Sequence, residues 1–224
     1  MTSDERWLAA AWPFVRAQLP PSPARVLEIG CGPLGGFVPM LRQDGHEAVD
    51  VDPEAPEGAG YHQVGFEQFN PPGEVDVVVA SLSLHHVSGL DEVLDRVRDT
   101  LTPDGTFVVV EWAWERFDDA TARWCFERLP PPGPEPGWLH RRRDEWIAAD
   151  VPWDDYVRGW ATADGMHTGE TVLRELGARF RTTMLERGPY FFPDLDGVSE
   201  EDEHAAIERS LIRATRIRFV GRRK

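Results

Sequence analysis

The sequence predicts one α/β domain in which helices cover both faces of a doubly wound, mostly parallel sheet. Short apolar runs alternate with stretches whose apolar residues recur at helical spacing, which is typical of β-α-β units. A glycine-rich turn joins the first apolar run to the helix that follows it. The length of 224 residues fits a single domain with a substantial core.

The first half of the chain predicts a regular succession of elements. Helical spacing of apolar residues predicts a helix over 4–19, with Ser3 or Asp4 as its N-cap, and the prolines from Pro20 onward end it. The elements expected next are a strand over 25–29, a turn over 30–36, a helix up to Gln43, a strand over 47–52 and a weak strand over 61–64.

The second half continues the pattern after a nearly continuous apolar run over 75–82, which is expected of a strand buried on both faces. A capping-box pattern at Ser88 and Asp91 predicts the start of a helix that runs to Leu101. The remaining expected elements are a turn over 103–105, a strand over 106–112, a helix capped by Thr168, a strand over 181–192, a helix over 200–215 and a strand over 216–220.

The stretch 112–166 breaks this pattern and is rich in tryptophan. Seven of the nine tryptophans lie in it, on either side of a proline-rich joint at 130–137. Two interpretations fit: the rings are the wall of a lid over a flat or apolar acceptor, or they form the core of a helical cap. The two interpretations are compatible.

Composition and charge argue against several classes of partner. The 24 Lys and Arg residues against 39 Asp and Glu residues give a net charge of −15, which disfavours nucleic acid and anionic membranes. Cys31 and Cys125 lie far apart without a metal-binding spacing, and no acidic cluster suggests a magnesium site, so we expect no metal. The chain shows neither a membrane-spanning run nor a secretion signal at its start, so we expect a cytoplasmic protein.

The glycine-rich turn predicts a nucleotide-type cofactor. Gly30-x-Gly32-x-x-Gly35 follows a strand and precedes a helix, and Asp52 follows about twenty residues later, where an acid can bind ribose hydroxyls. A dinucleotide and S-adenosylmethionine both fit this context. Glu28 favours the second, because a carboxylate near the turn would repel a pyrophosphate and attract a cation. The sequence also has no second glycine-rich β-α-β half.

Several segments together resemble one family. They are Val26-Leu27-Glu28-Ile29-Gly30-Cys31-Gly32-Pro33-Leu34-Gly35-Gly36, Val51-Asp52-Pro53, 75–82, His85-His86-Val87 and 101–107. The chain resembles the class I S-adenosylmethionine-dependent methyltransferases, strongly over about 24–112 and less over 168–220. The resemblance implies a Rossmann-like, doubly wound, mostly parallel seven-stranded sheet with an antiparallel C-terminal strand. One domain over 1–224 would comprise a cofactor-binding core (24–111), an inserted helical, Trp-rich cap on the substrate side (112–167) and a closing helix with strands (168–224).

The resemblance also implies roles for individual positions. Glu28 would act on the turn and on the ammonium of the cofactor, Gly30 and Gly32 would allow its close approach, and Asp52 would hold the ribose. Cys31, between the two glycines, is a further cofactor-binding candidate. Pro53 would pack on the adenine, and the backbone carbonyls of Ser81 and Leu82 would face the ammonium. The chain departs from the family at Leu34, where glycine is common, and at Gly65, where an acid is common. Phe66 and Glu67 are therefore the nearest candidates for adenine contact.

Methyl transfer from a sulfonium needs alignment above all, and a general base only if the acceptor is protonated. His85 and His86 follow the fourth strand at the ligand-binding edge of the sheet, so either is a candidate catalytic base or a packing residue of the next helix. Glu111, His140 and His167 are further candidates. The expected function is methyl transfer to an O or N nucleophile of a small molecule. The alternatives are a nicotinamide-dependent reductase, a non-catalytic cofactor-binding module and a methyltransferase acting on a protein. The oligomeric state stays open.

Overall fold

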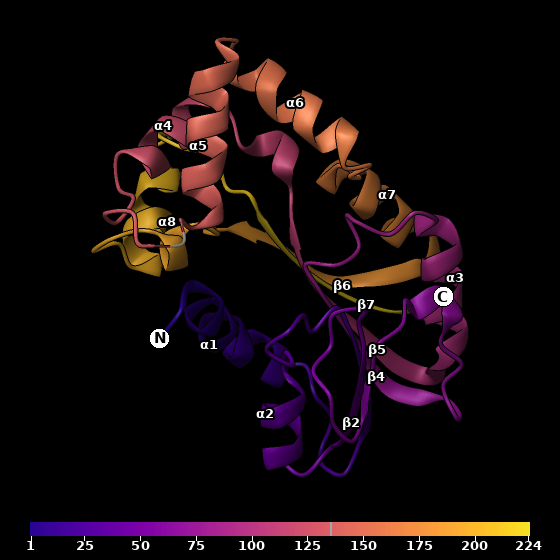
Figure 1. The fold of residues 1–224 in the computed structure, drawn as a ribbon. Helices are drawn as coiled ribbons and strands as arrows, with labels where there is room; N and C mark the ends of the chain where they lie inside the picture. The colour runs from indigo at the N-terminus through magenta and orange to yellow at the C-terminus, as the bar shows by residue number, and fades with distance from the viewer. Residues whose placement is uncertain (135) are drawn as a thin grey trace.

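A seven-stranded sheet runs through the centre of the computed structural model, which describes residues 1–134 and 136–224 (Figure 1). The strand order is β3-β2-β1-β4-β5-β7-β6. The strands are β1 (Arg25–Ile29), β2 (Glu47–Val51), β3 (Tyr61–His62), β4 (Val75–Ser81), β5 (Leu101–Trp112), β6 (Phe180–Gly188) and β7 (Arg216–Arg223). The first five strands pair in parallel, and β7 lies antiparallel to both β5 and β6. The predicted Rossmann-like fold with its antiparallel C-terminal strand is confirmed.

Helices cover both faces of this sheet. Alternation along the strands directs one set of apolar side chains, such as Leu27 and Val78, toward α3 and α7, and the other set, such as Val26 and Val77, toward α1 and α2. The helices are α1 (Ser3–Arg16), α2 (Val38–Gln43), α3 (Leu90–Thr100), α4 (Asp119–Phe126), α5 (Trp138–Ala149), α6 (Trp153–Ala163), α7 (Gly169–Arg179) and α8 (Glu200–Glu208). No helix among the described residues is both long enough and apolar enough to traverse a bilayer.

Two predicted helix starts were wrong. Helix α1 is capped by Thr2, because its side chain accepts a hydrogen bond from the N–H of Glu5 and the Glu5 carboxylate accepts one from the N–H of Thr2. Helix α3 begins after Gly89 without a side-chain cap, so the pattern at Ser88 and Asp91 does not form a capping box. Thr168 caps α7 as predicted, accepting from the N–H of Thr171.

Several element boundaries also differ from the predictions: α1 ends at Arg16, β3 at His62 and β7 at Arg223, and β5, β6 and α8 differ as well. Strand β5 already starts at Leu101, because the predicted turn at 103–105 is absorbed as an irregularity in the pairing with β4. Strand β6 ends at Gly188 instead of 192. Helix α8 ends at Glu208 because Ser210 takes a left-handed φ of +57°, and the N–H of Leu211 then bonds to the carbonyl of Ala206.

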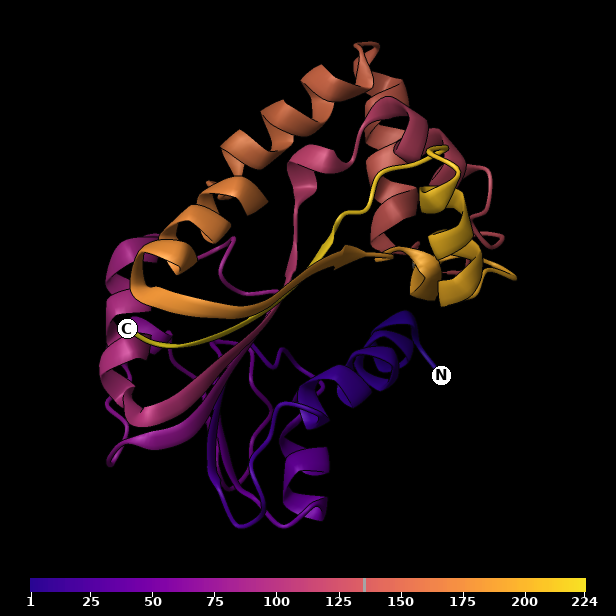
Figure 2. The same cartoon turned by 180° about the vertical axis from the view of Figure 1, so that it is seen from behind.

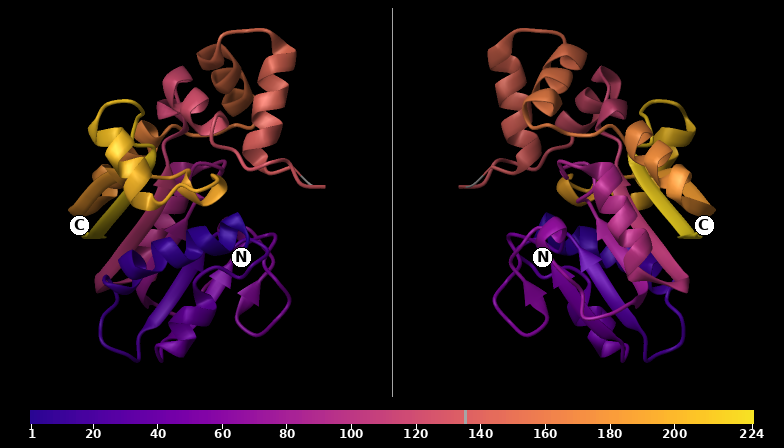
Figure 3. Two further views of the ribbon diagram at one scale, coloured as in Figure 1. Left: turned by 90° about the vertical axis from the view of Figure 1, so that its left-hand side faces the viewer. Right: turned by 90° about the vertical axis from the view of Figure 1, so that its right-hand side faces the viewer.

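A cap stands over one end of the sheet (Figure 3). Most of the tryptophans lie in this cap. Its aromatic cluster includes Trp112, Trp114 and the fully buried Trp153. Phe191 and Leu195, from the segment after β6, belong to the same cluster. Helix α8 lies beside α4 (Figures 2 and 3). Two stretches far apart in the sequence therefore build the cap together.

Candidate functional site

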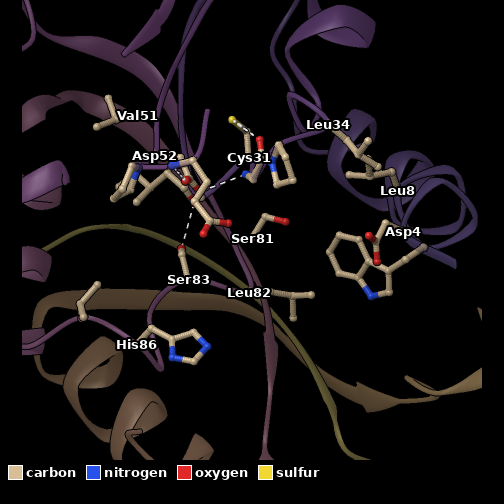
Figure 4. Close-up of a pocket in the computed structure, with 18 of the residues that line it drawn as sticks. Asp4, Leu8, Cys31, Leu34, Val51, Asp52, Ser81, Leu82, Ser83 and His86 are labelled. Carbon is tan, nitrogen blue, oxygen red and sulfur yellow. Dashed lines mark hydrogen bonds between the residues drawn. The ribbon is translucent and has the colours of Figure 1, made fainter. Parts of the chain in front are cut away.

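A cavity of about 630 Å³ opens at the carboxyl ends of β1, β2 and β4 (Figure 4). This is the edge at which doubly wound sheets bind ligands, and the volume is in the range of small-molecule sites. Most of the predicted site residues line it, namely Gly30, Cys31, Gly32, Asp52, Pro53, Phe66, Glu67, Ser81, Leu82 and His86. Glu28 and His85 do not line it.

The glycine turn lets the backbone itself form one wall of the cavity. Gly30 has a φ of +94°, and a Cβ there would lie 2.5 Å from the Cβ of Ser83. Gly32 has a φ of +59°, but a Cβ there would meet no described atom within 4 Å. Gly30 is therefore required by packing, whereas Gly32 leaves open space on the cavity side where a ligand can approach the backbone.

Glu28 lies beneath the turn, where it is fully buried. Its Oε2 accepts a 2.8 Å hydrogen bond from the N–H of Phe37, just before α2. Burial, with a further contribution from Asp50, raises the pKa of Glu28 well above its usual range. The predicted action on the turn is therefore seen. The predicted attraction of a cofactor ammonium has no support in this geometry, because the carboxyl group points under the turn and holds it closed.

Asp52 follows the last residue of β2 and ties two segments together at the cavity wall. Its Oδ2 accepts from the N–H of Gly32 at 2.9 Å, and its Oδ1 accepts from the N–H of Glu54 at 2.6 Å. A carboxylate has further lone pairs beyond these two bonds. Asp52 therefore fixes the glycine turn and keeps free acceptor positions on the cavity wall.

The far end of the cavity is formed by a short 3-10 helix, η1 (Phe66–Gln68). Phe66 is buried and Glu67 is exposed, and both line the cavity together with Gly65. The guanidinium of Arg96 lies 5.5 Å from the centre of the Phe66 ring and holds it from behind. The structure thus places an aromatic ring and a carboxylate on the cavity wall here, and their contact with an adenine stays a prediction.

The chain turns sharply after β4. Leu82 takes a left-handed φ of +51°, and its N–H bonds to the carbonyl of Val110 at 2.9 Å. The hydroxyl of Ser83 then donates to the carbonyl of Ile29 at 2.9 Å, which joins this turn to the glycine turn. A non-glycine residue in this conformation is strained, and such strain is often found at ligand sites.

His85 and His86 are adjacent but occupy different environments. His85 is buried, and its Nδ1 donates to Oε2 of the fully buried Glu111 at 2.6 Å. Burial alone would raise the pKa of Glu111, but His85 and the N–H groups of Leu84 and Trp112 lower it below its ordinary value. Glu111 is thus an ionised partner that orients His85 behind the cavity.

His86 reaches the cavity from the other side of this pair, and its ring centre lies 4.1 Å from that of His85 (Figure 4). Burial lowers the pKa of His86, and His85 lowers it further. The other two candidates are structural, because His140 bonds to the carbonyl of Pro130 and His167 to that of Val87. His86 is therefore the neutral imidazole that faces the cavity.

A second wall of the cavity comes from Trp138, one of the cap tryptophans, and from residues that the sequence did not predict as site residues. Tyr190, Pro193 and Asp194 follow β6, and Asp4 lies in the first turn of α1. Trp138, the first residue of α5, donates through Nε1 to Oδ2 of Asp194 at 3.1 Å. No local sequence pattern marks these positions, because only the packing of α1, of α5 and of the segment after β6 brings them to one cavity.

The charge of the cavity wall is one-sided. Five carboxylates line it, those of Asp4, Asp52, Glu54, Glu67 and Asp194, and no Lys or Arg is found among the described lining residues. A pyrophosphate would meet uncompensated repulsion here, whereas a cationic cofactor would be attracted. The sequence predicted that Glu28 would attract a cation, but in the structure these lining carboxylates are the groups placed to do so. No group of three or more His, Cys, Asp or Glu in the described part of the chain is arranged to hold a metal ion.

A parallel sheet extended by an antiparallel strand pair, with a cofactor-sized cavity at the ends of β1, β2 and β4, is the architecture of a class I methyltransferase. A family model described as a methyltransferase domain matches residues 5–160. The chain belongs to this family of S-adenosylmethionine-dependent methyltransferases. No curated protein matches the sequence.

Solved structures with the same fold are distant in sequence. An S-adenosylmethionine-dependent methyltransferase from Mesorhizobium loti is 20% identical, with a TM-score of 0.56 and coverage of 96% of this chain and 98% of that chain. The N-methyltransferase NodS from Bradyrhizobium japonicum, in complex with S-adenosyl-L-homocysteine, is 16% identical, with a TM-score of 0.53 and coverage of 96% and 86%. The 1,6-didemethyltoxoflavin-N1-methyltransferase of Burkholderia thailandensis, with bound 1,6-didemethyltoxoflavin and S-adenosylhomocysteine, is 16% identical, with a TM-score of 0.57 and coverage of 99% and 80%. Similarity at this level carries the fold and not the acceptor.

Proposed function

We propose that the protein transfers a methyl group from S-adenosylmethionine to an oxygen or nitrogen of a small molecule. The observation that carries this proposal is the continuity of the cavity. The glycine turn and Asp52 line one part of it, and Trp138 and Tyr190 line another. A single continuous cavity in this size range can hold two ligands side by side, as methyl transfer requires.

The residues that would hold the cofactor are those already placed on the cavity wall. The backbone at Gly30 and Gly32 would accept its amino-acid part, Asp52 its ribose and Phe66 its adenine. When bound, the cofactor supplies an activated methyl group on a positively charged sulfur. The protein then has to align the acceptor with that methyl group and exclude water, which contributes on the order of 7–11 kcal/mol in well-oriented systems.

His86 is the residue placed to take a proton from the acceptor. It faces the cavity, and its lowered pKa keeps the imidazole unprotonated at neutral pH. His85 acts through His86 as a positioning residue, because the ionised Glu111 fixes its ring against that of His86. A general base that is held in place by a buried, oriented neighbour is common in enzymes.

The surroundings of the cavity support a small acceptor and not a nucleic acid. The net charge of −15 and the five carboxylates on the cavity wall oppose a polyanion. The free, buried Cys31 and Cys125 support a reducing compartment, and we infer that the protein acts in the cytoplasm.

The first experiment is a calorimetric titration of the purified protein with S-adenosylmethionine, together with the Asp52→Ala variant. We expect binding, and a loss of at least tenfold in affinity for Asp52→Ala, because the variant removes both the ribose acceptors and the tie to Gly32. Asp91→Asn, an exposed carboxylate on α3, is the control and should bind normally.

The second experiment is incubation of the protein with methyl-labelled S-adenosylmethionine and a fractionated pool of small metabolites. Label in a small organic product supports the proposal. Absence of cofactor binding at millimolar concentration, or label only in protein, would contradict it. Cofactor binding without methyl transfer to any fraction would contradict the proposed enzyme and indicate a non-catalytic cofactor-binding module.

A further inference from the structure

The side of the cavity away from the adenine end combines aromatic rings with carboxylates. Trp7, Trp138 and Tyr190 supply the rings, and Asp4 and Asp194 supply the charges. Figure 4 shows Asp4 on the opposite side of the cavity from Asp52. The two carboxylates therefore belong to a different part of the site from the acid that is placed for the ribose.

Asp194 is held in place by its neighbours. It ends a short 3-10 helix, η3 (Phe192–Asp194), that lies against α1, and its Oδ2 accepts from Nε1 of Trp138. Glu203 fixes the preceding chain, since its buried carboxylate accepts from the N–H groups of Tyr190 and Phe192 at 2.7 Å each. The Asp194 carboxylate is thus a preorganised group.

The charged groups around Asp194 leave the cavity wall negative. Burial, with a smaller contribution from Asp4, raises the pKa of Asp194. Hydrogen bonds from Trp138 and Ser3, and the nearby charge of Arg6, lower it. Arg6 lies on the same helix as Asp4 but does not line the cavity. A cation placed in the cavity between Asp4 and Asp194 would relieve the repulsion between them and offset the cost of burying Asp194.

We propose that the acceptor is a cationic amine with a flat, apolar body, whose ammonium lies between Asp4 and Asp194 and whose body packs against Trp138 and Tyr190. This proposal rests on the proposed function and defines its substrate class. The aromatic rings fit such an acceptor for two reasons. They bury its apolar area, and their faces attract its positive charge. Acceptors that carry a phosphate or a carboxylate are disfavoured, since no Lys or Arg among the described residues lines the cavity to neutralise them.

The test uses three probes with the same ring and different charge: 2-phenylethylamine, 2-phenylethanol and phenylacetate. Each is titrated calorimetrically into the full-length protein saturated with S-adenosylhomocysteine. We expect the amine to bind at least tenfold more tightly than phenylacetate, with the alcohol between them. In Asp194→Asn the preference for the amine should fall below threefold, whereas the affinity for S-adenosylhomocysteine stays within twofold. Asp196→Asn, an exposed carboxylate two residues away that does not line the cavity, is the matched control and should keep the preference.

Each result decides the proposal separately from the proposed function. Equal binding of the three probes, tighter binding of phenylacetate, or no binding of any probe overturns the amine class, even if the protein methylates another acceptor. A loss of S-adenosylhomocysteine affinity in Asp194→Asn without a change in probe preference also overturns it, because the carboxylate would then serve the cofactor. If Asp194→Asn does not fold, Asp4→Asn, at the exposed end of α1, gives the same test with the same expected outcome.

Discussion

Asp50 offers a sharp test of the electrostatics beneath the glycine turn. It is fully buried on β2, directly opposite Glu28 in the pairing with β1, and neither of its carboxylate oxygens has a hydrogen-bond partner among the described residues. Burial raises the pKa of Asp50 to about 7. The charged form is therefore unfavourable in the folded protein, and we expect Asp50→Asn to stabilise it at alkaline pH.

The magnitude follows from the pKa values. One pKa unit corresponds to 1.36 kcal/mol, so the rise from the ordinary 3.8 to about 7 corresponds to about 4 kcal/mol. In the folded state Asp50 binds a proton that the unfolded chain has already lost between pH 4 and 7. The free energy of unfolding therefore falls as pH rises through this window. Asp50→Asn should be more stable than the wild type by about 4 kcal/mol at pH 8, with no advantage near pH 4.

The measurement is urea unfolding followed by circular dichroism at pH 4.5, 6 and 8. Asp91→Asn is the control, because its carboxylate is exposed and its removal should give no comparable gain at alkaline pH. A stability difference for Asp50→Asn that does not grow from pH 4.5 to pH 8 would refute the reasoning. It would show that Cys31 and the N–H of Val51, which lower the pKa of Asp50, fully offset the cost of its burial.

Two further predictions concern the turn and the base. Gly36→Ala should destabilise the fold by about 1–3 kcal/mol, because Gly36 has a φ of +53° and a Cβ would clash with the Glu28 carboxylate. Gly177→Ala in α7, where a Cβ meets no described atom within 4 Å, should instead be neutral or stabilising in the same thermal melts. His86→Asn should lower kcat by a factor of about 10²–10⁴, and it should abolish the acid limb of the pH–rate profile. In the wild type this limb should lie below pH 6.5, because burial and His85 lower the pKa of His86 against the opposing effects of Glu111 and Asp164. An unchanged acid limb in the variant would assign it to another group.

The cofactor half of the site could be predicted from the sequence because its chemistry is local. The glycine turn, Asp52 and the residues after β4 each follow a strand directly, so the topology of the sheet alone brings them to one edge. The prediction for Glu28 was wrong in one respect. Its place on the strand was predicted correctly, but its carboxylate binds the N–H of Phe37 and does not face a ligand. A carboxyl group beside a turn can face a ligand or the N–H groups of the following helix, and only the backbone path over 30–37 selects the second.

The acceptor half could not be predicted because its residues come from separate parts of the chain. Asp4 belongs to α1, Trp138 to α5, and Asp194 to the segment after β6. The sequence shows where the tryptophans lie along the chain, but not how deeply each side chain is buried in the cap. Trp153 is fully buried, whereas Trp138 lines the cavity, although both are the first residues of their helices.

The two interpretations of the tryptophan-rich stretch therefore apply to different residues. Trp112 supports the acceptor wall from behind, because its ring stacks on Tyr190 at 5.5 Å and meets the edge of Trp138 at 5.6 Å. Trp138 and Tyr190 in turn face the cavity. Since methyl transfer depends on alignment, this rigid support would contribute to the proposed reaction without touching a reacting atom. The cap thus has two layers, an inner pair of rings that lines the cavity and would contact the proposed acceptor, and an outer cluster that fixes the position of that pair.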